Sequence, residues 1–286
     1  MLSNKVSEIM TRDVLAAPVS ANIAEVMAIM VEKDVGRVVI AENDVPVGIF
    51  TEHDVLTRVM NKKLDPKETR IKAVMTVPVK KVPLNTHIVD ALGQMYKGGF
   101  RHLLVSGSDG NVVGMVSMRR ILKLAVEVGR GLGETQTVGS IMSGRFITVD
   151  GQHSISDTIA VMAKRNATCV VVLDRKFPKG IFTERDILAR VAVKKIDINN
   201  TPVREVMTAD VVCMPDSTLI GEVLAKMIEN GFRHMPIRAQ TGKLAGLVSM
   251  RDVLKYARAL DIDENVRKSW KEVQEFWESG DHYTPG

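Results

Sequence analysis

The sequence predicts a mixed α/β (α+β) protein built from four copies of one β-α-β-β-α unit. A methionine phrase recurs as VSEIMT, IKAVMT, VGSIMS and VREVMT, and its methionines are 65, 67 and 65 residues apart. Each phrase precedes a short apolar run, an amphipathic helical stretch and two β-like runs. Each copy then ends in glycine, a hydroxyl residue three positions later, and a second helical stretch. A fixed period of this kind is the signature of a repeated structural unit.

The first strand and helix of each copy follow the methionine phrase. The strand is VLAAP at 14–18 in the first copy and VVCMP at 211–215 in the fourth. The helix after it has apolar residues three and four positions apart, which indicates one face on a core. Its members are Ile155, Ile159 and Met162 in the third copy, and Leu219, Val223, Met227 and Ile228 in the fourth. Ser154 and Ser217 are the expected N-caps of these two helices.

The two later strands of a copy form a hairpin before the second helix begins. In the second copy, HLLVSG and VVGMV flank the turn sequence 108–111, SDGN. The second helix is TERDILARV at 183–191 in the third copy. A unit of roughly 55 residues is small for an independent core, so the copies should pack in pairs. Copies one and three share GIFTE, whereas copies two and four share GFRH and VSMR, so the chain is a duplicated pair.

The repeats set the expected domain boundaries. The four copies are expected at 6–60, 71–125, 138–192 and 203–257, with a helical tail at 258–286. The glycine-rich segment 125–137 is the natural linker between the pairs. In the tail, one helical face carries Val266, Trp270, Val273 and Trp277. That face fits a helix docked on its own domain, and it also fits a homodimer or partner contact.

Composition argues against several protein classes. No apolar run is long enough to span a bilayer, and the N-terminus has no signal-peptide core. Cys169 and Cys213 lie in apolar runs and suggest buried free thiols, so we expect a cytoplasmic protein without a membrane partner. The six histidines show no metal-ligand spacing, and we expect no metal. Because no catalytic motif occurs, we expect no enzyme and no catalytic cofactor.

The spacing of Gly48, Thr51 and Asp54 at a strand-to-helix junction has two interpretations. In the structural one, glycine permits a turn, and threonine with the acid forms a capping box. In the functional one, a ligand approaches the glycine backbone and the hydroxyl meets a phosphate or sugar oxygen. The carboxylate then accepts hydrogen bonds from two vicinal hydroxyls. Recurrence cannot decide between them, because a repeated fold repeats its caps. The equivalent sets are Gly180, Thr183 and Asp186, and Gly246, Ser249 and Asp252.

The methionine phrases, the size of the unit and the G-x-x-T-x-x-D ending together resemble cystathionine β-synthase (CBS) domains over residues 6–256. The resemblance implies two Bateman modules packed as a flat disc, with clefts that bind adenine nucleotides. It implies that Asp54, Asp186 and Asp252 hold the ribose, and that Thr51, Thr183 and Ser249 reach ribose or phosphate. It places the ligand against the backbone at Gly48, Gly180 and Gly246. The adenine would lie beside Thr11, Val14, Ser143, Phe146, Thr208 and Val211.

The second copy departs from the pattern, because Arg120 stands where the aspartate is expected. An arginine cannot accept hydrogen bonds, and two charge-assisted bonds are each worth roughly 1.5–3 kcal/mol. Their loss should weaken a site by at least ~100-fold. We therefore expect sites at copies one, three and four and an empty or degraded second cleft, where Arg120 could pair with the phosphate of a neighbouring site.

The resemblance also assigns a phosphate end. In the γ subunits of AMP-activated kinases, which also have four such domains, basic residues near the second strand meet phosphates. The resemblance therefore implies that phosphate is bound by Arg37, Arg101, His102, Arg233 and His234. The third copy has Thr168 and Cys169 instead, which weakens the assignment there. Secondary candidates are Arg185 and Arg251, followed by His53.

The leading interpretation is a nucleotide sensor that binds AMP first, then ADP and ATP, and regulates an unidentified partner protein. One alternative is an S-adenosylmethionine module, which needs the ribose contacts and no phosphate contacts. A nucleic-acid-binding protein would fit the pI of 9.1, but no basic run with interleaved aromatics supports it. The fourth interpretation is a structural scaffold, in which every aspartate is only a helix cap and binds no ligand.

Overall fold

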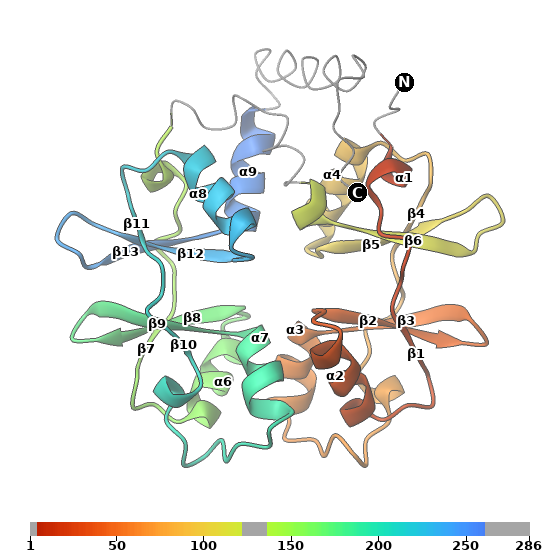
Figure 1. Cartoon of the computed structure of the whole chain (residues 1–286), viewed down its shortest axis with the longest axis horizontal. Coiled ribbons are helices and arrows are strands. Elements are labelled where there is room, and N and C mark those ends of the chain that lie inside the picture. The colour runs from red at the N-terminus through yellow and green to blue at the C-terminus, as the bar shows by residue number, and fades with distance from the viewer. Residues whose placement is uncertain (1–4, 122–135, 261–286) are drawn as a thin grey trace.

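Four small bodies of sheet and helix form a ring in the structure, a computed structural model that describes residues 5–121 and 136–260 (Figure 1). Copies one and two lie on one side of the ring, and copies three and four on the other. We call these sides the first and the second module. The predicted α/β fold, with four copies in two modules arranged as a disc, is confirmed.

The first copy contains α1 (Val6–Ile9), β1 (Ala16–Pro18), α2 (Ile23–Glu32), β2 (Arg37–Glu42), β3 (Val45–Thr51), α3 (Glu52–Asp54) and a π-helical turn, η1 (Val55–Met60). The second contains η2 (Ile71–Ala73), β4 (Lys81–Pro83), α4 (Ile88–Gly98), β5 (His102–Ser106) and β6 (Val112–Ser117).

The third copy contains η3 (Val138–Ser140), β7 (Thr148–Asp150), α6 (Ile155–Lys164), β8 (Cys169–Asp174), β9 (Phe177–Thr183), α7 (Glu184–Asp186) and a second π-helical turn, η4 (Ile187–Ala192). The fourth contains η5 (Val203–Glu205), β10 (Thr208–Ala209), β11 (Met214–Pro215), α8 (Ile220–Glu229), β12 (His234–Arg238), β13 (Leu244–Ser249) and α9 (Met250–Leu260).

Each sheet has the same core topology. The first strand pairs parallel to the middle strand, which pairs antiparallel to the third, as in β1-β2-β3. The first helix crosses from the edge strand to the middle strand and covers one face. The cap predicted at Ser154 is confirmed, since its Oγ accepts from the backbone N–H of Asp157 at 3.0 Å. The cap predicted at Ser217 is wrong, because a turn delays the helix and Leu219 takes the N-cap position.

The methionine phrases are exchanged between the two copies of each module. The first phrase bonds to the second copy, where Thr11 pairs with Met115, and the second phrase bonds to the first copy, where Thr76 pairs with Ile49. The third and fourth phrases are exchanged in the same way within the second module. Each sheet therefore receives a segment that belongs to its neighbour in sequence.

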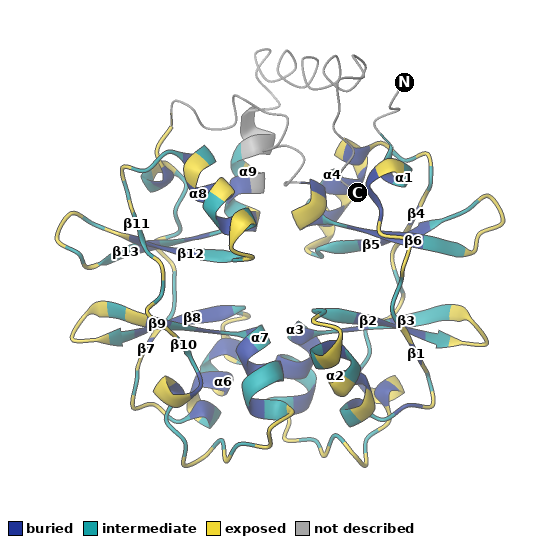
Figure 2. Cartoon of the chain, in the orientation of Figure 1, coloured by how far each residue is buried: buried dark blue, intermediate teal, exposed yellow. Residues whose placement is uncertain are grey.

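The hydrophobic cores, in contrast, run across the two modules. One cluster of buried side chains joins the bodies of copies one and three, and another joins those of copies two and four. The short helices η1 and η4 pack against each other, as do α3 and α7, and α4 packs against α9. Figure 2 shows buried residues where α3 and α7 meet. The disc is thus held by exchanged phrases within a module and by apolar packing between modules.

Two predictions fall largely outside the described residues. They are the linker at 125–137 and the apolar face of the tail formed by Val266, Trp270, Val273 and Trp277. Within the described ranges, no helix is both long and apolar enough to cross a membrane.

Candidate functional site

The glycine–hydroxyl–aspartate spacing forms a capping box in the three copies that have it. Thr51 donates its hydroxyl (2.7 Å) and its backbone N–H (2.9 Å) to Oδ2 of Asp54, whose own N–H donates back to Thr51 Oγ1 at 3.3 Å. The same three bonds recur between Thr183 and Asp186 and between Ser249 and Asp252. The cap uses one carboxylate oxygen, so the other oxygen, Oδ1, decides what more each aspartate can do.

Oδ1 faces the exchanged methionine phrase in copies one and three. Thr76 donates its hydroxyl to Oδ1 of Asp54 at 2.9 Å, and Thr208 donates to Oδ1 of Asp186 at 3.2 Å. Asp252 is the exception, because its Oδ1 has no hydrogen-bond partner among the described residues. Thr76 was missed from the sequence, since the exchange of phrases had not been foreseen.

Two arginines hydrogen-bond to the backbone of these exchanged phrases, and neither was predicted from the sequence. Arg58 donates to the backbone carbonyls of Val74 (2.9 Å) and Met75 (2.7 Å), and its Nε lies 3.3 Å from Asp54 Oδ1. Arg190 makes the equivalent contacts in the second module. The sequence does contain a pattern that could have identified them, because both arginines follow the aspartate by four residues in TEHDVLTR and TERDILAR.

The three predicted glycines are approached closely by methionine side chains of the exchanged phrases. An added Cβ would lie 2.3 Å from the Sδ atom of Met75 at Gly48, and 2.3 Å from that of Met207 at Gly180. At Gly246 it would lie 2.5 Å from the Sδ of Met142. These glycines therefore make room for the exchanged phrases, and none of them lines the central cavity described next.

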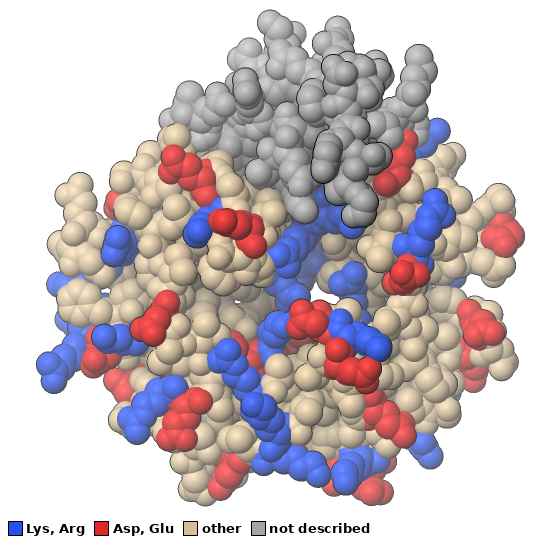
Figure 3. All heavy atoms as spheres, in the orientation of Figure 1, with Lys and Arg blue, Asp and Glu red and all other residues tan. Residues whose placement is uncertain are grey.

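A cavity of about 2430 Å³ occupies the centre of the disc and is lined by all four copies. Figure 3 shows basic side chains gathered around this hollow. Most of the predicted site residues line it, namely Arg37, Thr51, Asp54, Arg101, His102, Ser143, Phe146, Thr183, Arg185, Asp186, Thr208, Val211, Arg233, His234, Ser249, Arg251 and Asp252, together with His53. Thr76 and Val77 of the second phrase also line it.

The second copy also lines the cavity, but it lacks the capping-box aspartate. Ser117 accepts from the backbone N–H of Arg120 at 3.3 Å, but arginine cannot complete the capping box. The Arg120 side chain is exposed and does not line the cavity, so the expectation that it reaches a neighbouring phosphate there finds no geometric support. Thr11 and Val14 are also absent from the cavity wall, and the first phrase, to which Thr11 belongs, lies beside the second copy.

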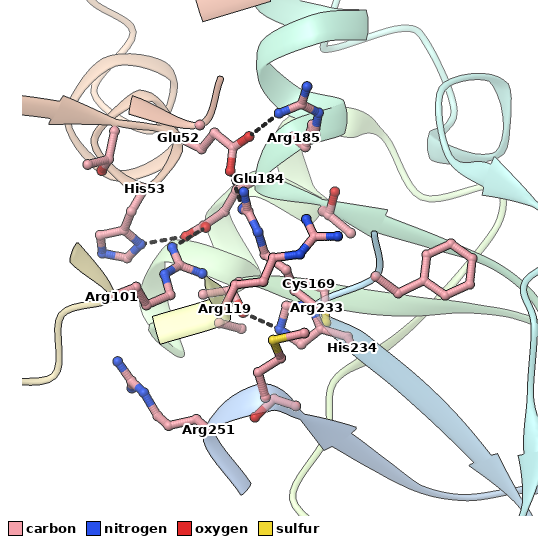
Figure 4. Close-up of a pocket in the computed structure, with 18 of the residues that line it drawn as sticks. Glu52, His53, Arg101, Arg119, Cys169, Glu184, Arg185, Arg233, His234 and Arg251 are labelled. Carbon is pink, nitrogen blue, oxygen red and sulfur yellow. Dashed lines mark hydrogen bonds and ion pairs between the residues drawn. The ribbon is translucent and has the colours of Figure 1, made fainter. Parts of the chain in front are cut away.

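Two buried glutamates hold the basic residues of the cavity (Figure 4). Glu52 of the first copy pairs with Arg185, at 3.1 Å, and with Arg233. Glu184 of the third copy lies 2.6 Å from His53 Nδ1 and 3.2 Å from Arg101. Both carboxylates are almost fully buried, and every one of these contacts crosses from one module to the other.

In copies two, three and four, the residue that follows the glutamate position is an arginine, and each of these arginines contacts the opposite module. Arg185 pairs with Asp34 at the end of α2. Arg119 donates to the carbonyl of Ile228 in α8 at 3.3 Å. Arg251 donates to the carbonyl of Gly99, just after α4, at 2.5 Å. A cation at the C-terminal end of a helix is favourable because of the helix dipole.

The histidines of the basic doublets are held neutral. Burial, followed by the charge of Arg101, lowers the pKa of His234 to about 4. Burial and three arginines hold the pKa of His102 well below its usual value. His234 Nε2 lies 2.7 Å from Oγ1 of Thr168, the residue that replaces a base in the third copy. Both histidines are thus uncharged, His234 serves as a hydrogen-bonding group, and arginines carry the charge.

Arginine pKa values show the same crowding of positive charge. Burial and the charge of Arg233 lower the pKa of Arg37 to about 10, and both also lower the pKa of Arg119 and of Arg185. The centre of the disc is therefore suited to an anion. No group of three or more metal-ligating side chains occurs within 5–121 or 136–260.

Comparison with known proteins agrees with this architecture. The family model for the CBS domain matches four times, at residues 6–61, 71–127, 138–193 and 203–259. A CBS domain-containing protein of Arabidopsis thaliana, CBSCBSPB1, is 27% identical over 95% of this chain, which spans 57% of that protein's length.

Two solved structures share the fold over 88% of this chain and 99% of their own. Protein MJ1225 of Methanocaldococcus jannaschii, proposed as an archaeal homologue of g-AMPK, has a TM-score of 0.75 at 17% identity. An uncharacterized conserved protein of Pyrococcus horikoshii has a TM-score of 0.61 at 20% identity.

Proposed function

Because the chain belongs to the CBS domain family, with four copies of that domain, we propose that it is a regulatory protein that binds an adenine nucleotide. AMP is the first candidate ligand, followed by ADP and ATP. The observation that carries the proposal is the central cavity, in which three Ser/Thr–Asp pairs and a cluster of arginines face one space.

Each part of a nucleotide finds matching chemistry on the cavity wall. A ribose diol can donate to the aspartate Oδ1 atoms, and Asp252 offers that oxygen without displacing an internal partner. Arginines suit the phosphate, since they form charge-assisted and often bidentate hydrogen bonds. Val77, Phe146 and Val211 supply apolar surface from the exchanged phrases for the base.

Binding would act on the arrangement of the copies. A nucleotide in this cavity contacts a body and an exchanged phrase of the same module, so it favours one relative orientation of the two. A ligand shifts such an equilibrium only through its different affinity for the two states. The regulated partner protein would bind one relative orientation of the copies in preference to the other.

Calorimetric titration of the nucleotide-stripped protein with AMP tests the proposal. We expect up to three sites per chain, and Asp54→Asn, Asp186→Asn and Asp252→Asn should each remove one or weaken it by about 100-fold. Asp157→Asn is the matched control, because Asp157 takes part in a Ser-x-x-Asp helix start and does not line the cavity. The proposal fails if AMP, ADP and ATP give no binding, or if all four variants bind like the wild type.

A further inference from the structure

The ion pairs at the centre of the disc are arranged as a reciprocal clasp between the modules. Glu52 of the first module holds Arg185 and Arg233 of the second, while Glu184 of the second module holds His53 and Arg101 of the first. In Figure 4 the two carboxylates lie close together, with their basic partners around them. Breaking the clasp would remove all four of these contacts between modules.

The position of each glutamate in the repeat does not itself need a charge. The equivalent residues in copies two and four are Met118 and Met250, which are also buried. A buried carboxylate is costly unless it is paired, and an apolar residue in its place is often neutral or stabilising. The fold therefore tolerates an apolar side chain here, and the charge at Glu52 and Glu184 calls for a different reason.

The basic partners of the clasp are the same groups that a ligand phosphate would use. Arg101, Arg185 and Arg233 all line the cavity. The whole wall carries ten arginines and Lys80 against eight carboxylates, and Arg37, Arg119 and Arg251 are among the arginines that hold no glutamate. The glutamates hold arginines that an oxyanion would otherwise bind, and they leave a surplus of positive charge that attracts such an anion.

We propose that Glu52 and Glu184 are internal competitors of the ligand phosphate and link nucleotide binding to the contact between the modules. A phosphorylated ligand takes Arg101 and Arg233 from these carboxylates, because a phosphate brings more charge and more acceptor oxygens than a carboxylate. Binding then breaks the ion pairs that tie one module to the other. This inference rests on the proposed function, since it concerns the phosphate end of the same site.

The charge-removing variants Glu52→Gln and Glu184→Gln, singly and together, test the competition by calorimetry. We expect the double variant to bind AMP at least about tenfold more tightly than the wild type, because the arginines no longer have an internal partner. Adenosine, which has no phosphate, should bind the variant and the wild type equally. Unchanged or weaker AMP binding by a folded double variant would overturn the proposal.

Glu229→Gln is the matched control. Glu229 also lines the cavity, but it is exposed, and it contacts Lys226 and Asn230 of its own copy rather than the other module. If it tightens AMP binding as much as the double variant does, the effect is general electrostatics and the specific competition is refuted. Should the double variant fail to fold, Glu52→Met and Glu184→Met copy the residues that the repeat uses in copies two and four.

Tripolyphosphate separates this inference from the proposed function. Tighter tripolyphosphate binding in the variants, with no AMP binding by any form, would support the competition and refute the nucleotide sensor. AMP binding that is equal in all forms would leave the sensor standing and refute the competition. Failure of both ligands to bind every form would refute both.

Hydrogen exchange provides an independent readout of the contact between modules. In the wild type, saturating AMP should speed exchange in 52–60 and 184–192, the segments that face each other across the clasp. In the double variant this acceleration should be lost, because the ion pairs are already absent. Equal acceleration in both proteins would contradict the link.

Discussion

Lowering the pH from 7.5 to 5 should destabilise the folded chain, because His234 stays neutral inside it. The imidazole lies among Arg101, Arg233 and Glu184 and contacts Thr168. Its pKa is about 4 in the folded chain and about 6.5 in an unfolded one. On acidification the unfolded state takes up the proton first. The free energy of unfolding therefore falls from about pH 6.5 down to about pH 4, and this loss is absent at pH 7.5.

The size of the effect follows from these two pKa values. One pKa unit corresponds to 1.36 kcal/mol, and pH 5 lies about 1.5 units below the pKa of the unfolded histidine. His234 should therefore cost about 2 kcal/mol at pH 5. At roughly 2–4 °C per kcal/mol for a chain of this size, Tm should fall by about 4–8 °C. His102 shifts in the same direction and adds to the total.

Thermal unfolding of the wild type and of His234→Gln at pH 7.5 and pH 5 isolates this contribution. Glutamine can keep a hydrogen bond to Thr168 but does not titrate, so its Tm should fall by about 4–8 °C less than that of the wild type. His153→Gln is the control, because His153 is exposed and should leave the pH dependence unchanged. Equal pH dependence in the wild type and His234→Gln would refute the reasoning.

Two further predictions concern the exchanged phrases. Arg190→Ala should lower the free energy of unfolding by about 1–3 kcal/mol, since the carbonyls of the fourth phrase lose a charged donor; denaturant unfolding measures this, and an unchanged midpoint would contradict it. Gly180→Ala should cost about 1–3 kcal/mol, because its Cβ would lie 2.3 Å from Met207 Sδ and 2.8 Å from the Thr208 carbonyl. Gly144→Ala, with no atom within 4 Å, should change Tm little by comparison, and equal Tm losses would argue against the steric explanation.

Local patterns were enough to predict the repeated unit. The spacing of the four methionines, the apolar stripe around Ile159 and the cap at Ser154 depend on neighbours in sequence, and the structure agrees with them. The capping boxes at Asp54 and Asp186 were one of two interpretations, and their geometry is present. Sequence alone could not reveal that the cap leaves one carboxylate oxygen for other contacts.

Contacts between distant segments could not be predicted in the same way. Thr76 was overlooked because the second copy seemed degraded at Arg120, although its phrase serves Asp54 in the first copy. The partners of Glu52 and Glu184 are 83 to 181 positions away along the chain. No periodicity connects such residues, since their meeting depends on how two modules pack.

The exchange of phrases also has a consequence for the order in which the chain can fold during synthesis. Domains fold as units from the N-terminus while the chain grows. The first body cannot be completed until residues 71–76 have followed it. The second body finds its missing segment, residues 6–11, already made. Folding should therefore proceed module by module, and a chain stalled between the first two copies would leave an incomplete body and an unpaired leading segment.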